Sequence, residues 1–264
     1  MEFSQVRPGV FVTTLSEEET NVILLVGETG SLLVDTGSTP EVGRQVLTAV
    51  GQTTDLPLQT VVLTHAHWDH SFGLPAFANY ETLGHENLDK DLPCNENQAW
   101  AKKQGLSIPD LTNIKLLSVI GVRDLGNLSV EIAHFGQAHS RTDLIIAVPA
   151  HRVVIVGDLV EDGPPQFDET SSIKGWVTSL DSLYALLKHD TLIIPGHGAP
   201  LTPQHVAHFR SGLAAIWDQA EWAFHQGIPV TEVYDHKDLH WPWDRTTAEK
   251  GITLAYQELH HGDA

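Results

Sequence analysis

The chain has 264 residues, of which 41% are hydrophobic and 19% charged, an ordinary composition for a globular protein with a sizeable core. Its 15 basic and 34 acidic residues give a formal net charge of −19, which argues against a nucleic-acid partner because such partners need a basic surface. Cys94 is the single cysteine, so an internal disulfide and a metal site built from thiolates are both excluded.

The first third of the chain predicts a β-meander, a helix and then a short buried strand. Thr39 is the expected N-cap of the helix, because Pro40 follows it at a position where a missing N–H costs nothing. A second, short helix is expected at 72–78. The expected strands, which combine apolar runs with Gly-rich turns, lie at residues 10–15, 22–26, 31–35, 59–63 and 82–84.

The remainder alternates strands with helices after a polar segment at about 85–117, which we interpret as an insertion with one or two helices. A C-terminal extension begins at about 228 and contains a short helical stretch at 253–259. The pattern favours one domain over 1–264, with two sheets packed on each other and helices outside. The other expected elements are strands at 118–122, 129–134, 144–148, 153–156 and 191–194, and helices at 176–187 and from Thr202-Pro203 to about 227.

No stretch of the sequence approaches the roughly 20 apolar residues that a membrane-spanning helix needs. The opening segment, Met1 to Pro8, also lacks the basic and then apolar pattern of a secretory signal. We therefore expect a cytoplasmic protein with a small-molecule substrate and no membrane partner.

The chemistry is concentrated directly after the buried strand, where four potential metal ligands fall within six residues. His65 and His67 lie two residues apart, so both can reach one ion from an extended or turning backbone. Asp69 and His70 are adjacent, so their side chains diverge and can serve a second ion. Scattered histidines do not explain this spacing at a strand end, even though the chain contains 16 of them.

Three further candidate ligands follow strand ends or sharp turns: His139, Asp158 and His197. Each is weak alone, because an isolated histidine is more often a surface residue than a ligand. Together they complete two sets, with three imidazoles for one ion and an aspartate that can bridge both. The first set is His65, His67 and His139, the second is Asp69, His70 and His197, and Asp158 is the expected bridge.

This ordered set resembles the metallo-β-lactamase superfamily over about residues 9–225, and the resemblance includes the early turn Asp35-Thr36-Gly37. The resemblance implies an α+β fold, a four-layer αββα sandwich, with two divalent metal ions at one edge. Zn²⁺ is the most common ion, with Mn²⁺ or Fe as possibilities, and a hydroxide held between the ions is the nucleophile. It also implies that Asp69 is catalytic, orienting the attacking water or accepting its proton, and that Asp35 and Ser140 support the ligands.

Two positions depart from the true lactamases. Asp158 stands where the best-known lactamases carry a metal-binding cysteine, and Glu161 stands where they carry a lysine for the substrate carboxylate. Asp158 is instead similar to the bridging aspartate of hydroxyacylglutathione hydrolases, lactonases and related esterases. The resemblance therefore predicts a dinuclear hydrolase of an ester, thioester, lactone or lactam, and leaves the substrate open.

Other classes of protein share parts of this signature. Persulfide dioxygenases carry the H-x-H-x-D-H motif with a single iron, and this redox chemistry is the main alternative. Flavodiiron proteins usually carry glutamate at the position of His67, and no flavin domain follows here. The charge opposes nucleic-acid processing, and the seven filled ligand positions oppose a non-catalytic binding module.

The surroundings of the site predict the charge of the substrate. Residues 158–162 bring negative charge to the stretch that carries a cation in the lactamases, and the nearest following cation is Lys174. Arg141 could supply a cation from the other side. We expect neutral acyl substrates to be preferred over carboxylate-bearing β-lactams, and the insertion at 85–117 and the tail around Trp241 and Trp243 to flank the site.

Overall fold

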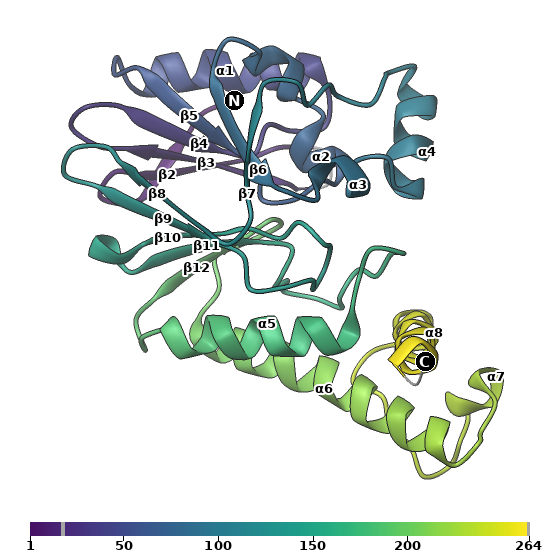
Figure 1. Ribbon diagram of the computed structural model, residues 1–264. Helices are drawn as coiled ribbons and strands as arrows, with labels where there is room; N and C mark the ends of the chain where they lie inside the picture. Colours follow the sequence, from purple (N-terminus) through teal and green to yellow (C-terminus); the bar gives the residue numbers. More distant parts are fainter. Residues whose placement is uncertain (17–18, 263–264) are drawn as a thin grey trace.

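The computed structural model describes residues 1–16 and 19–262, and it places two β-sheets face to face between outer helices (Figure 1). The N-terminal sheet has its outer face covered by α1 (Pro40–Thr53), and the C-terminal sheet by α5 (Ile173–Leu186) and α6 (Pro203–His225). This is the predicted four-layer αββα sandwich.

The N-terminal sheet has seven strands, which are hydrogen-bonded in the order of the sequence. Its first strands pair antiparallel, whereas β4 to β7 are parallel. The carboxyl ends of β4 and β5 therefore meet at the same edge of the sheet. The strands are β1 (Ser4–Arg7), β2 (Val10–Thr14), β3 (Asn21–Val26), β4 (Ser31–Val34), β5 (Leu58–Val62), β6 (Glu81–His85) and β7 (Ile114–Leu117).

The C-terminal sheet has the order β12-β11-β10-β9-β8, and its β11 and β12 are also parallel. The turn between β10 and β11 is the 3₁₀ helix η2 (Pro149–His151). Because β11 and β12 are parallel, their carboxyl ends also meet at one edge of their sheet. The strands are β8 (Ile120–Asp124), β9 (Ser129–Ala133), β10 (Ile145–Val148), β11 (Val153–Gly157) and β12 (Leu192–Pro195).

Alternating side chains divide the core into layers, because successive residues of a strand point to opposite faces of a sheet. In β3, Ile23 and Leu25 pack between the two sheets, whereas Val22 and Leu24 pack under α1. In β11, Ile155 faces the other sheet, while its neighbours on either side face α5 and α6. These strands are buried on both faces, which fixes the positions of the loops that follow them.

The expected strands and the two long helices are confirmed with boundaries that shift by a few residues. The strand β1 was not predicted. The expected helix at 72–78 is reduced to the 3₁₀ helix η1 (Leu74–Phe77), directly after the one-turn helix α2 (Trp68–Ser71). The segment 85–117 contains α3 (Leu88–Asp91) and α4 (Asn95–Gln104), but its last four residues form β7 and extend the sheet instead of staying outside it.

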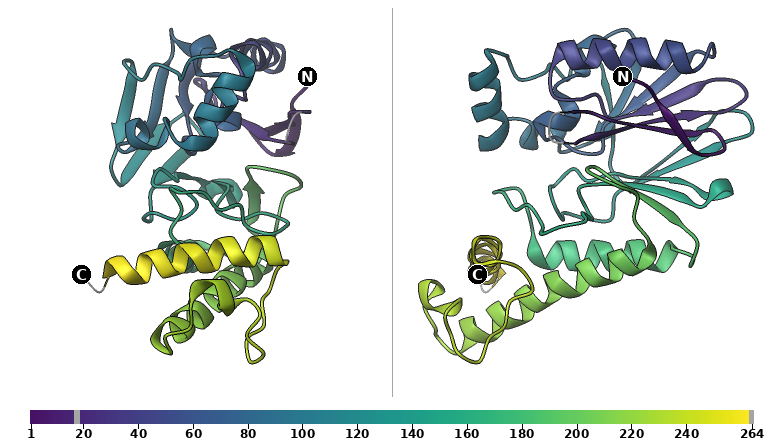
Figure 2. Two further views of the ribbon diagram at one scale, coloured as in Figure 1. Left: turned by 90° about the vertical axis from the view of Figure 1, so that its right-hand side faces the viewer. Right: turned by 180° about the vertical axis from the view of Figure 1, so that it is seen from behind.

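The C-terminal extension is more helical than expected. It contains the short α7 (Val230–Val233) and then α8 (Arg245–Gly262), which lies across α6 and α5 (Figure 2). Ala255 and Ile252 of α8 are buried against this helical layer. Within the described part of the chain, no helix combines the length and hydropathy that crossing a bilayer requires.

Candidate metal centre

All seven predicted ligands come together where the two sheets meet. His65, His67, Asp69 and His70 lie in the segment that leaves β5 and enters α2. Asp158 follows β11 directly, and His197 lies two residues after β12. Because both strand pairs are parallel, their carboxyl ends bring these loops together, as open α/β sheets commonly do at a ligand site.

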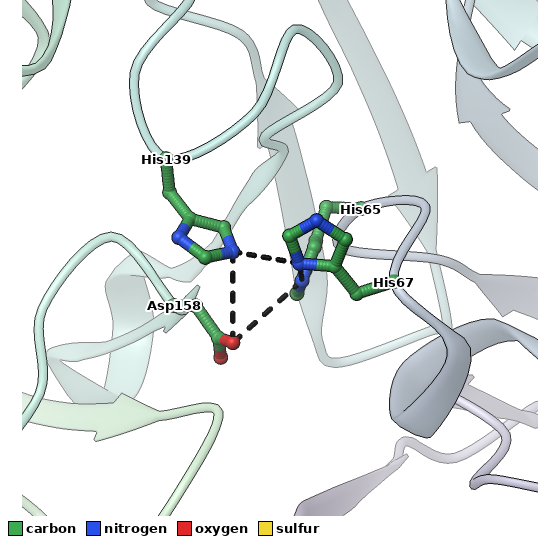
Figure 3. Close-up of side chains that lie close together, drawn as sticks. All are labelled: His65, His67, His139 and Asp158. Carbon is green, nitrogen blue, oxygen red and sulfur yellow. Dashed lines mark hydrogen bonds and ion pairs between the residues drawn. The ribbon is translucent and has the colours of Figure 1, made fainter. Parts of the chain in front are cut away.

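Three imidazoles converge in the first group (Figure 3). His67 Nδ1 lies 3.1 Å from His65 Nε2 and 2.8 Å from His139 Nε2. One carboxylate oxygen of Asp158, Oδ2, lies 3.7 Å from His65 Nε2 and 3.8 Å from His139 Nε2. All four side chains are buried, and one donor atom of each lies within 4.8 Å of the others.

The second group contains Asp69, His70 and His197. Asp69 Oδ2 lies 3.2 Å from His70 Nε2 and 3.1 Å from His197 Nε2. Asp158 also belongs to this side, because its Oδ1 lies 3.3 Å from His70 Nε2 and its Oδ2 lies 3.4 Å from His197 Nε2. A single carboxylate therefore faces both groups, as expected for a bridging ligand.

The residues present fit a pair of divalent ions. Imidazole nitrogens and carboxylate oxygens are the donors that zinc, manganese and iron accept. Asp158 Oδ1 is buried without a hydrogen-bond partner among the described residues, an arrangement that a cation would satisfy. A Cβ at Gly196 would lie 1.9 Å from Asp158 Oδ1 and 2.9 Å from a carbon of His70, so only glycine leaves this space open.

Asp35 supports the second group, as the resemblance implied. His70 Nδ1 donates to Asp35 Oδ2 over 2.8 Å, which turns His70 Nε2 toward Asp69 and Asp158. The same carboxylate accepts from the backbone N–H and the hydroxyl of Thr64 at 2.7 and 2.8 Å. Asp35 itself has positive φ, 66°, a conformation that aspartate tolerates better than most residues.

The expected supporting role of Ser140 is wrong. Its backbone N–H and its hydroxyl donate to Asp143 at 2.8 and 2.7 Å, and neither contacts a ligand ring. Ser140 thus shapes the turn after His139. The other ring nitrogen of His139, Nδ1, is buried with no hydrogen-bond partner among the described residues.

Sequence reasoning missed Asp168, which lies 101 residues from the histidine it supports. His67 Nε2 donates to Asp168 Oδ2 over 2.9 Å, which directs His67 Nδ1 at the other two imidazoles. The second oxygen of Asp168 accepts from the backbone N–H and the hydroxyl of Thr170, each at 2.7 Å. The Ser171 hydroxyl donates to the carbonyl of His139, so one loop positions two ligands.

Two residues at the start of β3 were also missed. The Asn21 side-chain amide donates to the carbonyls of Pro195 and Gly198, on either side of the turn that carries His197. The Thr20 hydroxyl donates to Asp69 Oδ2 over 3.3 Å. Neither residue belongs to a recognisable motif, because the pairing depends on a contact between distant parts of the chain.

The ligand groups open into a cavity of about 600 Å³, which we name the metal-site cavity. The insertion contributes Glu96 to its wall, and the C-terminal extension contributes three residues of α8, further along the chain than the expected segment around Trp241 and Trp243. Neither tryptophan of the extension is in this wall; Trp243 packs on Phe209 and Gly212 instead. The wall is formed by His67, Trp68, Asp69, Glu96, His139, Asp158, Glu161, Pro164, Pro165, Gln166, Phe167, Asp168, His197, Thr246, Thr247 and Lys250.

Residues 15–197 match the model of the Metallo-beta-lactamase superfamily. The chain belongs to this superfamily. Its relatives include a Metallo-beta-lactamase type 2 from Bacillus sp. (strain 170), 24% identical over 67% of this chain and 66% of that enzyme. An acyl-coenzyme A thioesterase from Gallus gallus is 25% identical over 69% of this chain and 73% of its own length.

Among solved structures, the stereoselective inverting sec-alkylsulfatase from Pseudomonas sp. shares the superfamily fold with this chain at a TM-score of 0.79 and 16% identity. The likeness covers 97% of this chain and 50% of the alkylsulfatase. The likeness in fold therefore extends beyond residues 15–197, which match the superfamily model, and includes the C-terminal helices of this chain.

The charges of the ligand groups follow from burial and from their neighbours. Burial lowers the pKa of His65 well below its ordinary value and that of His139 to about 4. Burial acts in the same direction on His67, but the hydrogen bond and charge of Asp168, together with the charges of Glu96 and Asp69, outweigh it and raise the pKa to about 9. At His70, burial is outweighed by Asp69, Asp158 and Asp35 together, and the pKa is raised well above its ordinary value. At His197, burial is outweighed by Asp158 and Asp69 together, and the pKa is raised to about 11.

We expect metal loading at pH 7 to release about three protons, because His67, His70 and His197 have raised pKa values and must lose a proton to bind a metal. A raised pKa keeps these groups protonated at pH 7, so affinity should weaken as the pH falls. Calorimetric zinc titration in buffers of different ionisation enthalpy measures the protons released. A value near zero would contradict this assignment of charges.

We expect Asp168→Asn to lower zinc affinity by roughly 10- to 100-fold, because His67 loses the carboxylate that fixes its orientation. Glu169→Gln is the matched control, since that neighbouring carboxylate accepts from the backbone of Asn95 and does not contact a ligand. Competition with a chromophoric chelator measures both affinities. Equal affinities in the two variants would show that Asp168 does not support the site.

Proposed function

We propose that this protein is a metal-dependent hydrolase of carboxylic-acid derivatives, namely esters, thioesters, lactones or lactams, with two divalent ions, most often Zn²⁺. The observation that carries the proposal is the position of Asp158, one buried carboxylate facing two complete ligand groups. Five imidazoles and one further carboxylate around it are more donors than one tetrahedral ion can use. A second ion accounts for the excess.

The first ion would be held by His65, His67 and His139, and the second by Asp69, His70 and His197, with Asp158 shared. When bound, such ions lower the pKa of water toward about 7 and polarise a carbonyl group. The protein holds the donors in place before any substrate arrives, because Asp35, Asp168 and Asn21 fix the ligands or their loops from behind. Little rearrangement is then needed during the reaction.

Asp69 is the proposed proton acceptor. Its Oδ2 faces the Asp158 side of the cluster and is held by the Thr20 hydroxyl, and the side chain also lies in the cavity wall. A carboxylate in this place can accept a proton from the attacking water and pass it to the leaving group. A carboxylate has two oxygens, so Asp69 can bind an ion and still accept a proton, which a metal-bound imidazole cannot do.

The names of two relatives support hydrolysis of an acyl bond, whereas another relative is named as an alkylsulfatase. The Bacillus enzyme is named for a lactam and the Gallus gallus enzyme for a thioester, and both are carboxylic-acid derivatives. Trp68, Pro164 and Phe167 give the cavity apolar surface beside the polar ligand groups, as small-molecule sites usually have. This composition suits an acyl chain better than a highly charged polymer.

A hydrolysis screen of purified, metal-loaded protein tests the proposal. Thioesters, lactones, esters, β-lactams, phosphodiesters and alkyl sulfates should be compared, and we expect turnover of acyl substrates that is lost on chelation and restored by zinc or manganese. Turnover of alkyl sulfates alone would contradict the substrate class. One tightly bound iron with oxygen-dependent chemistry would favour the persulfide dioxygenase alternative.

Asp158→Ala and His197→Ala should have different effects on metal content. Asp158 faces both groups, so its removal should weaken both ions, whereas removal of His197 should mainly empty the second site. Metal titration with two resolved binding steps measures the difference. The same stoichiometry in both variants would contradict a bridging role for Asp158.

A further inference from the structure

We propose that Lys250 is a specificity residue that binds a carboxylate on the substrate at a distance from the bond to be cleaved. The inference rests on the proposed function, acyl hydrolysis in the metal-site cavity. It assigns the substrate class more narrowly, as acyl compounds that are neutral around the scissile bond and anionic at the far end.

Lys250 is the one lysine or arginine in the described wall of the cavity. It is exposed, so it lies toward solvent, whereas the ligand side chains at the base are mostly buried. No hydrogen bond or ion pair to another described residue engages its ammonium group. Thr246 and Thr247 line the cavity one turn earlier on α8 and add hydroxyl groups beside it.

The cations that sequence reasoning considered are engaged elsewhere. Arg141 donates to the buried carboxylate of Asp91 over 2.7 Å and does not line the cavity. Lys174 lies over the ring of Trp217, 5.1 Å from its centroid, and is likewise outside the wall. The expectation that Arg141 could face the substrate is therefore wrong. The cation at this site is Lys250 of α8, which lies far beyond Glu161 in the sequence.

The described cavity wall offers a substrate carboxylate no lysine or arginine other than Lys250. Asp168 lies there in addition to the ligand carboxylates, and burial raises the pKa of Glu161 to about 8, whereas Glu96 is exposed like Lys250. Asp168 accepts from His67 and Glu96 accepts from the Trp68 indole over 3.0 Å, and an ionised carboxylate has no proton to donate to a substrate carboxylate. A substrate carboxylate close to the scissile bond would meet these groups, whereas one at the end of a chain could reach Lys250.

This arrangement separates two kinds of anionic acyl compound. A β-lactam antibiotic carries its carboxylate beside the lactam ring, within the acidic part of the cavity. A linear acyl chain with a terminal carboxylate can place its carbonyl at the ligand groups and its anion near α8. The two differ in the distance between the reacting carbonyl and the charge, and net charge alone does not separate them.

The test compares p-nitrophenyl hexanoate with its ω-carboxy analogue, the mono-p-nitrophenyl ester of adipic acid. We expect Lys250→Gln to lower the kcat/KM ratio of the ω-carboxy ester to the neutral ester by roughly three- to tenfold, as for an exposed ion pair. The loss should fall on KM rather than kcat, because the contact is equal in the ground and transition states. Lys250→Glu should lower the ratio further.

Lys237→Gln is the matched control, because it removes the same charge from an exposed position at a separate hollow beside α7. Esters of succinic and suberic acid extend the series and should show an optimum chain length in the wild-type protein that Lys250→Gln abolishes. An unchanged ratio in Lys250→Gln, or the same change in Lys237→Gln, would overturn the proposal.

A binding measurement separates this proposal from the proposed function. The mono-anilide of adipic acid and hexanoic anilide resist hydrolysis, so calorimetry can compare their dissociation constants in wild-type and Lys250→Gln protein. If neither ester is hydrolysed, a preference for the ω-carboxy anilide that depends on Lys250 still supports the binding site. If the esters are hydrolysed without that preference, acyl hydrolysis stands and the role of Lys250 is rejected.

Discussion

The buried carboxylate of Asp158 is the interaction on which the site depends. It faces His65 and His139 on one side and His70 and His197 on the other, at 3.3 to 3.8 Å. Burying a carboxylate among histidines is costly unless opposite charge compensates it. In the metal-free protein that charge comes from protonated histidines, and in the loaded protein divalent ions would supply it. The site therefore exchanges protons for metal without leaving the carboxylate uncompensated.

The fold makes this convergence possible through two pairs of parallel strands. β4 and β5 end beside each other in one sheet, and β11 and β12 do so in the other. The loops after them bring Asp35, the histidine cluster, Asp158 and His197 to one edge, where the two sheets pack face to face. Gly196 is part of the same constraint, since any Cβ there would occupy the space between Asp158 and His70. The extension adds α8, which supplies part of the cavity wall without supplying a ligand.

The sequence predicted the sandwich and the seven candidate ligands because both have local signals. Buried strands are short apolar runs, and the ligands sit at strand ends in a recognisable spacing. Asp168, Asn21 and Lys250 had no such signal, since each acts through a contact with a segment far away in the chain. Ser140 and Arg141 were misassigned for the converse reason. They adjoin His139 in sequence, but their polar groups are engaged by Asp143 and Asp91. Nearness along the chain was a poor guide to which side chains face the cavity.

The central claim is that two ions share Asp158. Anomalous diffraction from crystals grown with zinc, with data collected on both sides of the zinc absorption edge, tests it most directly. The account predicts two peaks, one among His65, His67 and His139 and one among Asp69, His70 and His197, with Asp158 between them. A single peak at saturating zinc, or two peaks with Asp158 turned away from one of them, would contradict it.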